Sequence, residues 1–141
     1  MISNRSMLPS VVIPELAYRD VGEAVAWLCA AFGFRERLRI GDHRAQLTVG
    51  EGGSLVVTDG AAAPKVAGGY ACHRLMIRVA DVDSHCREAA RLGAKILSPP
   101  TDYPFGERQY SVEEPGGHRW VFSQSIADVD PASWGGQWLG G

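Results

Sequence analysis

The alternation of apolar and polar residues predicts one series of elements that occurs twice along this chain. Residues 11–18 alternate as a strand, and Pro14, which lacks a backbone donor, places this strand at a sheet edge or has its nitrogen facing outward. An amphipathic helix follows, which Asp20 caps and Gly33 ends. The first series is completed by three short strands, at residues 35–40, 45–49 and 54–58.

The second series begins after a segment of small residues, 61–70, which we interpret as a linker. A predicted strand at residues 75–79 is followed by a second helix, which runs from the capping residue Asp81 to Gly93. These two residues lie 61 and 60 positions after their counterparts in the first helix. The internal repeat therefore indicates an α+β fold built from two βαβββ modules.

A β-hairpin closes the second module and has two different faces. Its arms are residues 109–112 and 119–123, and the turn between them contains Pro115 and paired glycines. Period-two alternation places four apolar side chains on one face: Tyr110, Val112, Trp120 and Phe122. The other face is largely polar and suits a sheet with a helix behind it and a lined cleft in front.

The other segments are assigned by composition. The predicted organisation is a polar, loosely held N-terminal segment (1–10), a first module (11–60), a second module (71–125) and a C-terminal tail (126–141). Trp134 is expected to hold this tail against its own module or a partner. The proline-rich residues 99–106 are predicted to form a stiff loop that carries Tyr103 and Phe105 to the mouth of the cleft.

Composition narrows the range of functions. The chain has 141 residues, 45% of them hydrophobic, and a net charge of −2, which offers no electrostatic attraction for nucleic acid or an anionic membrane. Its three cysteines form no paired motif, which favours a reducing, cytoplasmic location. Neither a signal peptide nor an apolar stretch of membrane-spanning length is expected from the sequence.

Several short motifs carry a family resemblance. R-D-V and A-D-V-D follow the first strand of each module, F-G-F and L-G-A lie at the helix ends, and E-P-G-G-H-R-W-V-F forms the closing hairpin. Over residues 11–125 the chain resembles the glyoxalase/bleomycin-resistance/extradiol-dioxygenase superfamily, also called the vicinal oxygen chelate fold. The resemblance implies half-barrel sheets with helices on their outer faces and a cleft between paired modules. Enzymes of this family hold a divalent metal in the cleft, whereas other members lack a metal and sequester antibiotics.

The resemblance also indicates which positions would bind a metal. They are occupied here by Ile13, Val56, Arg74 and Val121. These side chains cannot build a divalent site of imidazole and carboxylate ligands, so we expect no metal, no other cofactor and no catalytic residue. An alternative alignment, shifted by one residue, would make His73 a ligand.

Alternation of the strands predicts the ligand-binding residues. Apart from the two aromatic residues at the cleft mouth, Tyr103 and Phe105, they are Glu15, Gln46, Arg74, Met76, Arg78, Gln109, Ser111 and Arg119. The arginines could bind a planar or anionic group of a ligand. An equally favoured interpretation is that they form ion pairs with Glu15, Glu107 or Glu113.

We therefore expect a homodimeric, metal-free protein that binds a small organic, antibiotic-like molecule. One alternative is a metal-dependent lyase or dioxygenase of the same superfamily. Another is a structural interaction module whose cleft is filled by its own side chains. A partner nucleic acid or membrane is not expected.

Overall fold

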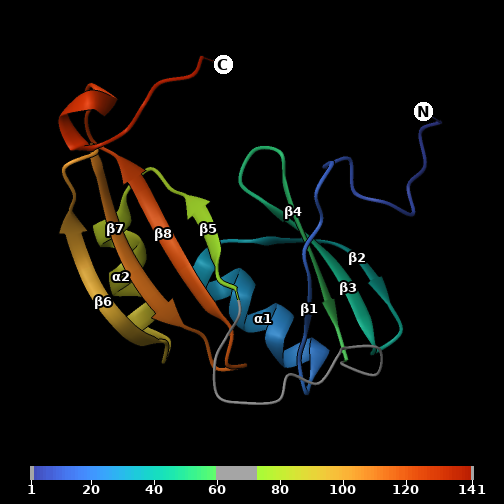
Figure 1. Cartoon of the computed structure of the whole chain (residues 1–141). Helices are drawn as coiled ribbons and strands as arrows, with labels where there is room; N and C mark the ends of the chain where they lie inside the picture. The colour runs from blue at the N-terminus through green and yellow to red at the C-terminus, as the bar shows by residue number, and fades with distance from the viewer. Residues whose placement is uncertain (1, 60–72, 141) are drawn as a thin grey trace. The chain divides into compact units, whose positions relative to one another are not determined.

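The computed structural model describes residues 2–59 and 73–140 and confirms the α+β fold of two βαβββ modules (Figure 1). The chain divides into two compact units, Met1–Gly69 and Tyr70–Gly141. Each unit contains an open four-stranded sheet with one helix against one of its faces. The predicted linker at 61–70 lies outside the described residues.

The first module follows the order strand, helix and three strands. Its elements are β1 (Glu15–Ala17), α1 (Val21–Phe32), β2 (Arg35–Ile40), β3 (Arg44–Val49) and β4 (Gly53–Thr58). The sheet order is β1-β4-β3-β2, in which β1 runs parallel to β4 and the other neighbours are antiparallel. The Asp20 carboxylate accepts the backbone N–H of Glu23 at 2.9 Å, which caps α1 as the sequence predicts.

The second module repeats this topology. Its elements are β5 (Leu75–Arg78), α2 (Val82–Arg91), β6 (Lys95–Asp102), β7 (Glu107–Glu113) and β8 (Arg119–Ser125), followed by a short 3₁₀ helix, η1 (Pro131–Trp134). The sheet order is β5-β8-β7-β6, with β5 parallel to β8. Asp81 caps α2 by accepting the backbone N–H of Ser84 at 3.1 Å.

The core of each module lies between its helix and the helix-facing side of its sheet. In the second module the predicted hairpin pairing is confirmed, because Val112 pairs with Trp120 and Tyr110 with Phe122. All four of these side chains are buried. The ring of His85 in α2 lies against Phe122 at a tilt of 34°, with ring centroids 4.0 Å apart, so this face of the hairpin packs against the helix. The residues between them therefore lie on the opposite face.

Two predicted boundaries are wrong. The first strand is only Glu15–Ala17 rather than residues 11–18, since regular pairing begins after Pro14. Its predicted edge position is nevertheless confirmed. The supposed loop at 99–106 is partly strand: β6 extends to Asp102 and includes both prolines. It tolerates them because β6 is an edge strand whose register shifts between Ser98 and Thr101.

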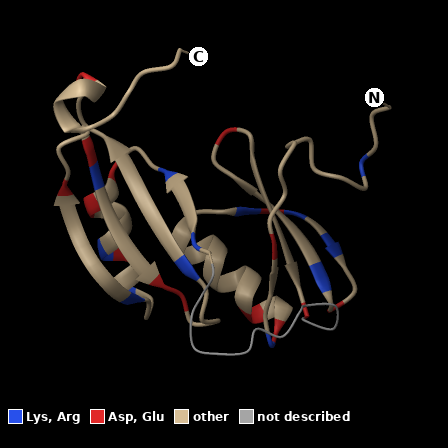
Figure 2. Cartoon of the chain, in the orientation of Figure 1, with Lys and Arg blue, Asp and Glu red and all other residues tan. Residues whose placement is uncertain are grey.

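The charges and helix lengths agree with an ordinary globular chain. Basic and acidic residues are interspersed in each module (Figure 2), as the small net charge of the chain indicates. Across residues 2–59 and 73–140, no helix has the length and apolar character needed to cross a membrane.

Candidate ligand-binding face

Each sheet has a helix-free face, defined as the face turned away from its own helix. In the second module, strand pairing brings predicted ligand-binding residues together on this face. One row crosses the sheet as Met76, Val121 and Ser111, and the next row as Arg78, Ser123 and Gln109. Val121 is 2% exposed and Met76 is 59% exposed. The face therefore combines an apolar centre with polar groups around it.

A chain of hydrogen bonds crosses the second row. The Gln109 amide donates to the Ser123 hydroxyl at 3.1 Å, and that hydroxyl donates to the Glu107 carboxylate at 2.6 Å. The Ser123 hydroxyl lowers the pKa of Glu107, with further contributions from Ser125 and from the positive charge of Arg78. The carboxylate is therefore kept ionised on this face. The carbonyl oxygen of Gln109 and the hydroxyl of Ser111 accept and donate no hydrogen bond to the described residues.

Glu107 and Ser123 were not among the predicted site residues. Ser123 lies on the polar face of the predicted hairpin, whereas Glu107 lies two residues before the predicted first arm. Extending the period-two pattern by two residues on that arm alone places Glu107 on the same face as Gln109. Glu107 pairs with Ser125 in the adjacent row, and its carboxylate reaches Ser123 across the two rows.

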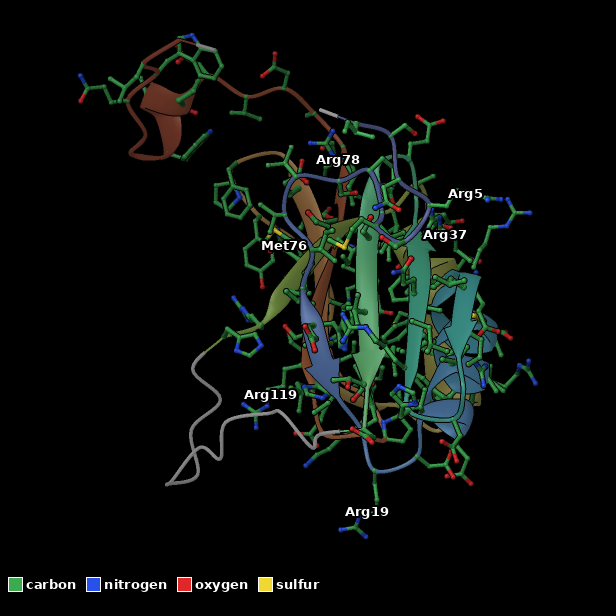
Figure 3. All side chains as sticks on the ribbon, turned by 90° about the vertical axis from the view of Figure 1, so that its right-hand side faces the viewer. Arg5, Arg19, Arg37, Met76, Arg78 and Arg119 are labelled. Carbon is green, nitrogen blue, oxygen red and sulfur yellow. The ribbon has the colours of Figure 1, made fainter. Side chains whose placement is uncertain are left out.

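The sequence left two roles open for the arginines, ligand binding and ion pairing, and the structure shows an ion pair for only some of them. Arg119 forms a salt bridge with Glu113 at 3.4 Å. Glu15 also forms a salt bridge, but with Arg44 at 3.0 Å rather than with a second-module arginine. Arg74 and Arg78 make no hydrogen bond or salt bridge to residues 2–59 or 73–140, although Arg78 acts electrostatically on Glu107. Figure 3 labels Arg78, Met76 and Arg119, which come from the edge strand β5 and its neighbour β8. Two guanidinium groups are thus available for a ligand.

The two predicted rim aromatics belong to a cluster held by the C-terminal tail. Tyr103 and Phe105 stack at 5.4 Å with an interplanar angle of 11°, and Trp134 meets Phe105 edge-on at 5.9 Å. This contact confirms that Trp134 holds the tail against its own module. All three rings keep more than a third of their surface exposed, so they can still contact a ligand.

The equivalent face of the first module is covered by the N-terminal segment. Gln46 is 3% exposed, and its amide donates to the backbone carbonyl of Ser6 at 2.8 Å. The Ser10 hydroxyl donates to the Gly52 carbonyl at 2.6 Å, and Leu8 is 4% exposed. Residues 5–10 therefore contact the sheet through hydrogen bonds and the buried Leu8, contacts that composition did not predict.

A divalent metal does not fit the residues at the family's ligand positions. Ile13, Val56 and Val121 offer no donor atom, and Arg74 offers a positive charge. Nor do residues 2–59 and 73–140 contain any group of three or more histidine, cysteine or acidic side chains arranged to hold a metal ion. The one nearby carboxylate of the first module, Glu15, is paired with Arg44.

The two cysteines among the described residues lack the features of a reactive thiol. Cys29 and Cys86 are free thiols, and burial raises the pKa of both. A raised pKa reduces the thiolate fraction near neutral pH, so neither is an activated nucleophile. Cys72 lies outside the described residues.

Solved structures of other proteins share this fold. TioX from Micromonospora sp. ML1 has 39% sequence identity and a TM-score of 0.69, over 83% of this chain and 99% of that one. A glyoxalase/bleomycin resistance protein/dioxygenase family enzyme from Burkholderia phytofirmans PsJN matches at 16% identity, TM-score 0.70, over 83% and 99% of the two chains. Lactoylglutathione lyase from Agrobacterium tumefaciens matches at 18% identity, TM-score 0.61, over 84% and 96%. The last two show the fold alone.

Sequence comparison identifies the family. No curated protein matches the chain significantly. Residues 10–122 match the family model described as Glyoxalase/Bleomycin resistance protein/Dioxygenase superfamily, which agrees with the resemblance seen in the motifs. With the repeated βαβββ topology and these structural relatives, the chain belongs to the glyoxalase/bleomycin resistance protein/dioxygenase superfamily.

Proposed function

We propose that this protein binds a small organic molecule without a metal, on the helix-free face of the second sheet. One observation carries the proposal: this face places the exposed apolar side chain of Met76, next to the buried Val121, beside polar side chains that can still form hydrogen bonds, Arg78, Gln109 and Ser111. Ligand sites commonly combine an apolar lining with a few convergent polar groups. A planar, partly aromatic molecule suits this combination.

The same chemistry favours binding over catalysis. Catalysis by this superfamily's metal enzymes requires donor atoms that the corresponding positions here do not supply. The Glu107 carboxylate already accepts hydrogen bonds from serine hydroxyls, and its lowered pKa makes it a weak base at neutral pH. Sequestration needs affinity alone, which apolar contact and charge-assisted hydrogen bonds provide.

The experiment is a thermal-shift screen of the purified protein against aromatic antibiotics and divalent metals, followed by titration calorimetry of each hit. Arg78→Ala and Gln109→Ala should each weaken binding of an antibiotic hit about tenfold, because each loses a hydrogen bond to the ligand. Arg87→Ala is the matched control, since Arg87 is an exposed arginine on α2, on the other side of the sheet.

Two results would contradict the proposal. One is a hit whose affinity is reduced equally by Arg87→Ala and Arg78→Ala, which would place the site elsewhere. The other is stoichiometric Ni, Zn, Fe or Mn in the purified protein, removed by a chelator together with an enzymatic activity. That second result would favour a metal-dependent lyase or dioxygenase.

A further inference from the structure

The N-terminal segment lies on the first sheet in the manner of a bound peptide. Gln46 donates to the carbonyl of Ser6 at 2.8 Å, and Arg37 donates to the carbonyl of Arg5 at 3.1 Å. Figure 3 labels Arg5 and Arg37, which lie close together where this segment meets the sheet. Two consecutive backbone carbonyls are therefore held by side chains of two neighbouring strands.

The two donor side chains are themselves connected. Arg37 donates to the carbonyl oxygen of Gln46 at 2.5 Å, which fixes the amide with its N–H groups toward Ser6. The guanidinium contributes charge-assisted bonds, which are stronger than neutral ones. Farther along the segment Leu8 is buried, and the Ser10 and Ser54 hydroxyls meet at 2.5 Å. The segment is thus bound through both its backbone and a side chain.

The second module gives an internal comparison. Gln109 corresponds to Gln46 in the sequence repeat, but its amide donates to Ser123 of the neighbouring strand. The same residue type thus binds a separate chain segment in one module and its own sheet in the other. The N-terminal contact is consequently a specialised feature of the first module rather than a property of the fold.

We propose that the helix-free face of the first sheet is a peptide-binding surface whose resident ligand is the chain's own N-terminal segment. Its ligand class is a peptide with a turn that presents two consecutive carbonyls to Arg37 and Gln46, followed by an aliphatic side chain two residues beyond the second carbonyl. Main-chain bonds supply affinity in such sites and the side chain supplies specificity. This inference does not depend on the proposed small-molecule site in the second module.

Limited trypsin digestion of the full-length protein tests the attachment, with mass spectrometry as the readout. Cleavage after Arg5 requires the segment to leave the sheet, because its carbonyl is bound by Arg37. Its rate follows the population of the released state. Leu8→Ala and Gln46→Leu should each accelerate this cleavage at least about tenfold. Val11→Ala is the matched control, since Val11 is 98% exposed and should leave the rate unchanged.

Cleavage after Arg44 separates local release from general unfolding, because Arg44 lies in strand β3. The proposal requires cleavage after Arg5 to rise relative to cleavage after Arg44. Equal rises at both sites in both variants, or no rise after Arg5, would overturn it.

A second measurement tests recognition directly. Leu8→Asp in the full-length chain should vacate the face, and a synthetic peptide of residues 2–10 should then bind to it in place of the segment. An attached segment has an effective concentration of about millimolar, so the peptide is titrated into that range. Binding should shift the Gln46 side-chain amide signal in NMR spectra. The peptide carrying the same Leu8→Asp change should not bind, and equal shifts with both peptides would overturn the assignment.

Discussion

The Glu107 carboxylate shows how a single residue on the helix-free face of the second sheet links binding chemistry to stability. It accepts the Ser123 hydroxyl, and the pKa lowered by Ser123, Ser125 and Arg78 means that its ionised form is the stabilised one. A group with a depressed folded-state pKa stabilises the fold above its ordinary pKa. The stabilisation by ionised Glu107 is lost as the pH falls through its lowered pKa.

Glu107→Gln should therefore change the acid side of the stability profile. We expect the wild-type protein to be the more stable of the two at neutral pH, and the difference to shrink below pH 4.5, the ordinary value for glutamate. Melting temperatures measured from neutral pH to about pH 3 would show the convergence. Glu51→Gln, at an exposed turn position, serves as control and should run parallel to wild type. A constant difference between wild type and Glu107→Gln would contradict this account.

The joining of the C-terminal tail to the β6–β7 turn depends on one glycine. Gly106 has φ +84°, and its carbonyl accepts the N–H groups of Ile126 at 2.8 Å and Ala127 at 3.2 Å. A Cβ at this position would lie 2.0 Å from the Ala127 carbonyl oxygen. Only glycine therefore allows the tail to approach closely enough for Trp134 to reach Phe105.

Gly106→Ala should detach the tail from the aromatic cluster. Amide hydrogen exchange over residues 126–134 should become faster, because the two backbone bonds to position 106 are displaced. Gly117→Ala is the matched control: its φ is +92°, but an added Cβ there would meet nothing within 4 Å. That variant should lose about 1–2 kcal/mol of stability through backbone strain, with the tail still protected. Unchanged exchange over 126–134 in Gly106→Ala would refute the close-approach argument.

Both sheets of the protein are open, and their edge strands pair with no further strand among residues 2–59 and 73–140. β1 and β2 are the edge strands of the first sheet, and β5 and β6 those of the second. Exposed apolar side chains occur on three of these strands, with Ile40 at 41%, Leu97 at 39% and Met76 at 59% exposure. Exposed edges with apolar side chains favour association with another chain.

We expect the protein to form a two-fold symmetric homodimer, because isologous pairing of identical edges closes the assembly. Sedimentation velocity at micromolar concentration should give about twice the mass of the 15.2 kDa chain. The prediction would be contradicted if the protein is monomeric at micromolar concentration and binds an antibiotic hit as tightly there as it does at high protein concentration.

The sequence alone determined the features that depend on local interactions. Each helix could be predicted from its aspartate cap and apolar stripe, and the hairpin from Pro115 and the glycines that follow it. The repeat of these signals at an offset near 60 residues was enough to predict the two modules, because each local element appears twice in the same order.

The tertiary structure alone decided the features that depend on strands distant in the sequence. The parallel pairings of β1 with β4 and of β5 with β8 determine the rows of side chains that share a face. For that reason the partner of Glu15 is Arg44, and Arg78 lies in the same row as Ser123. The placement of residues 5–10 on the first sheet likewise has no local signal. Its hydrogen bonds join positions about 30 to 45 residues apart, a separation that no periodicity in the sequence reports.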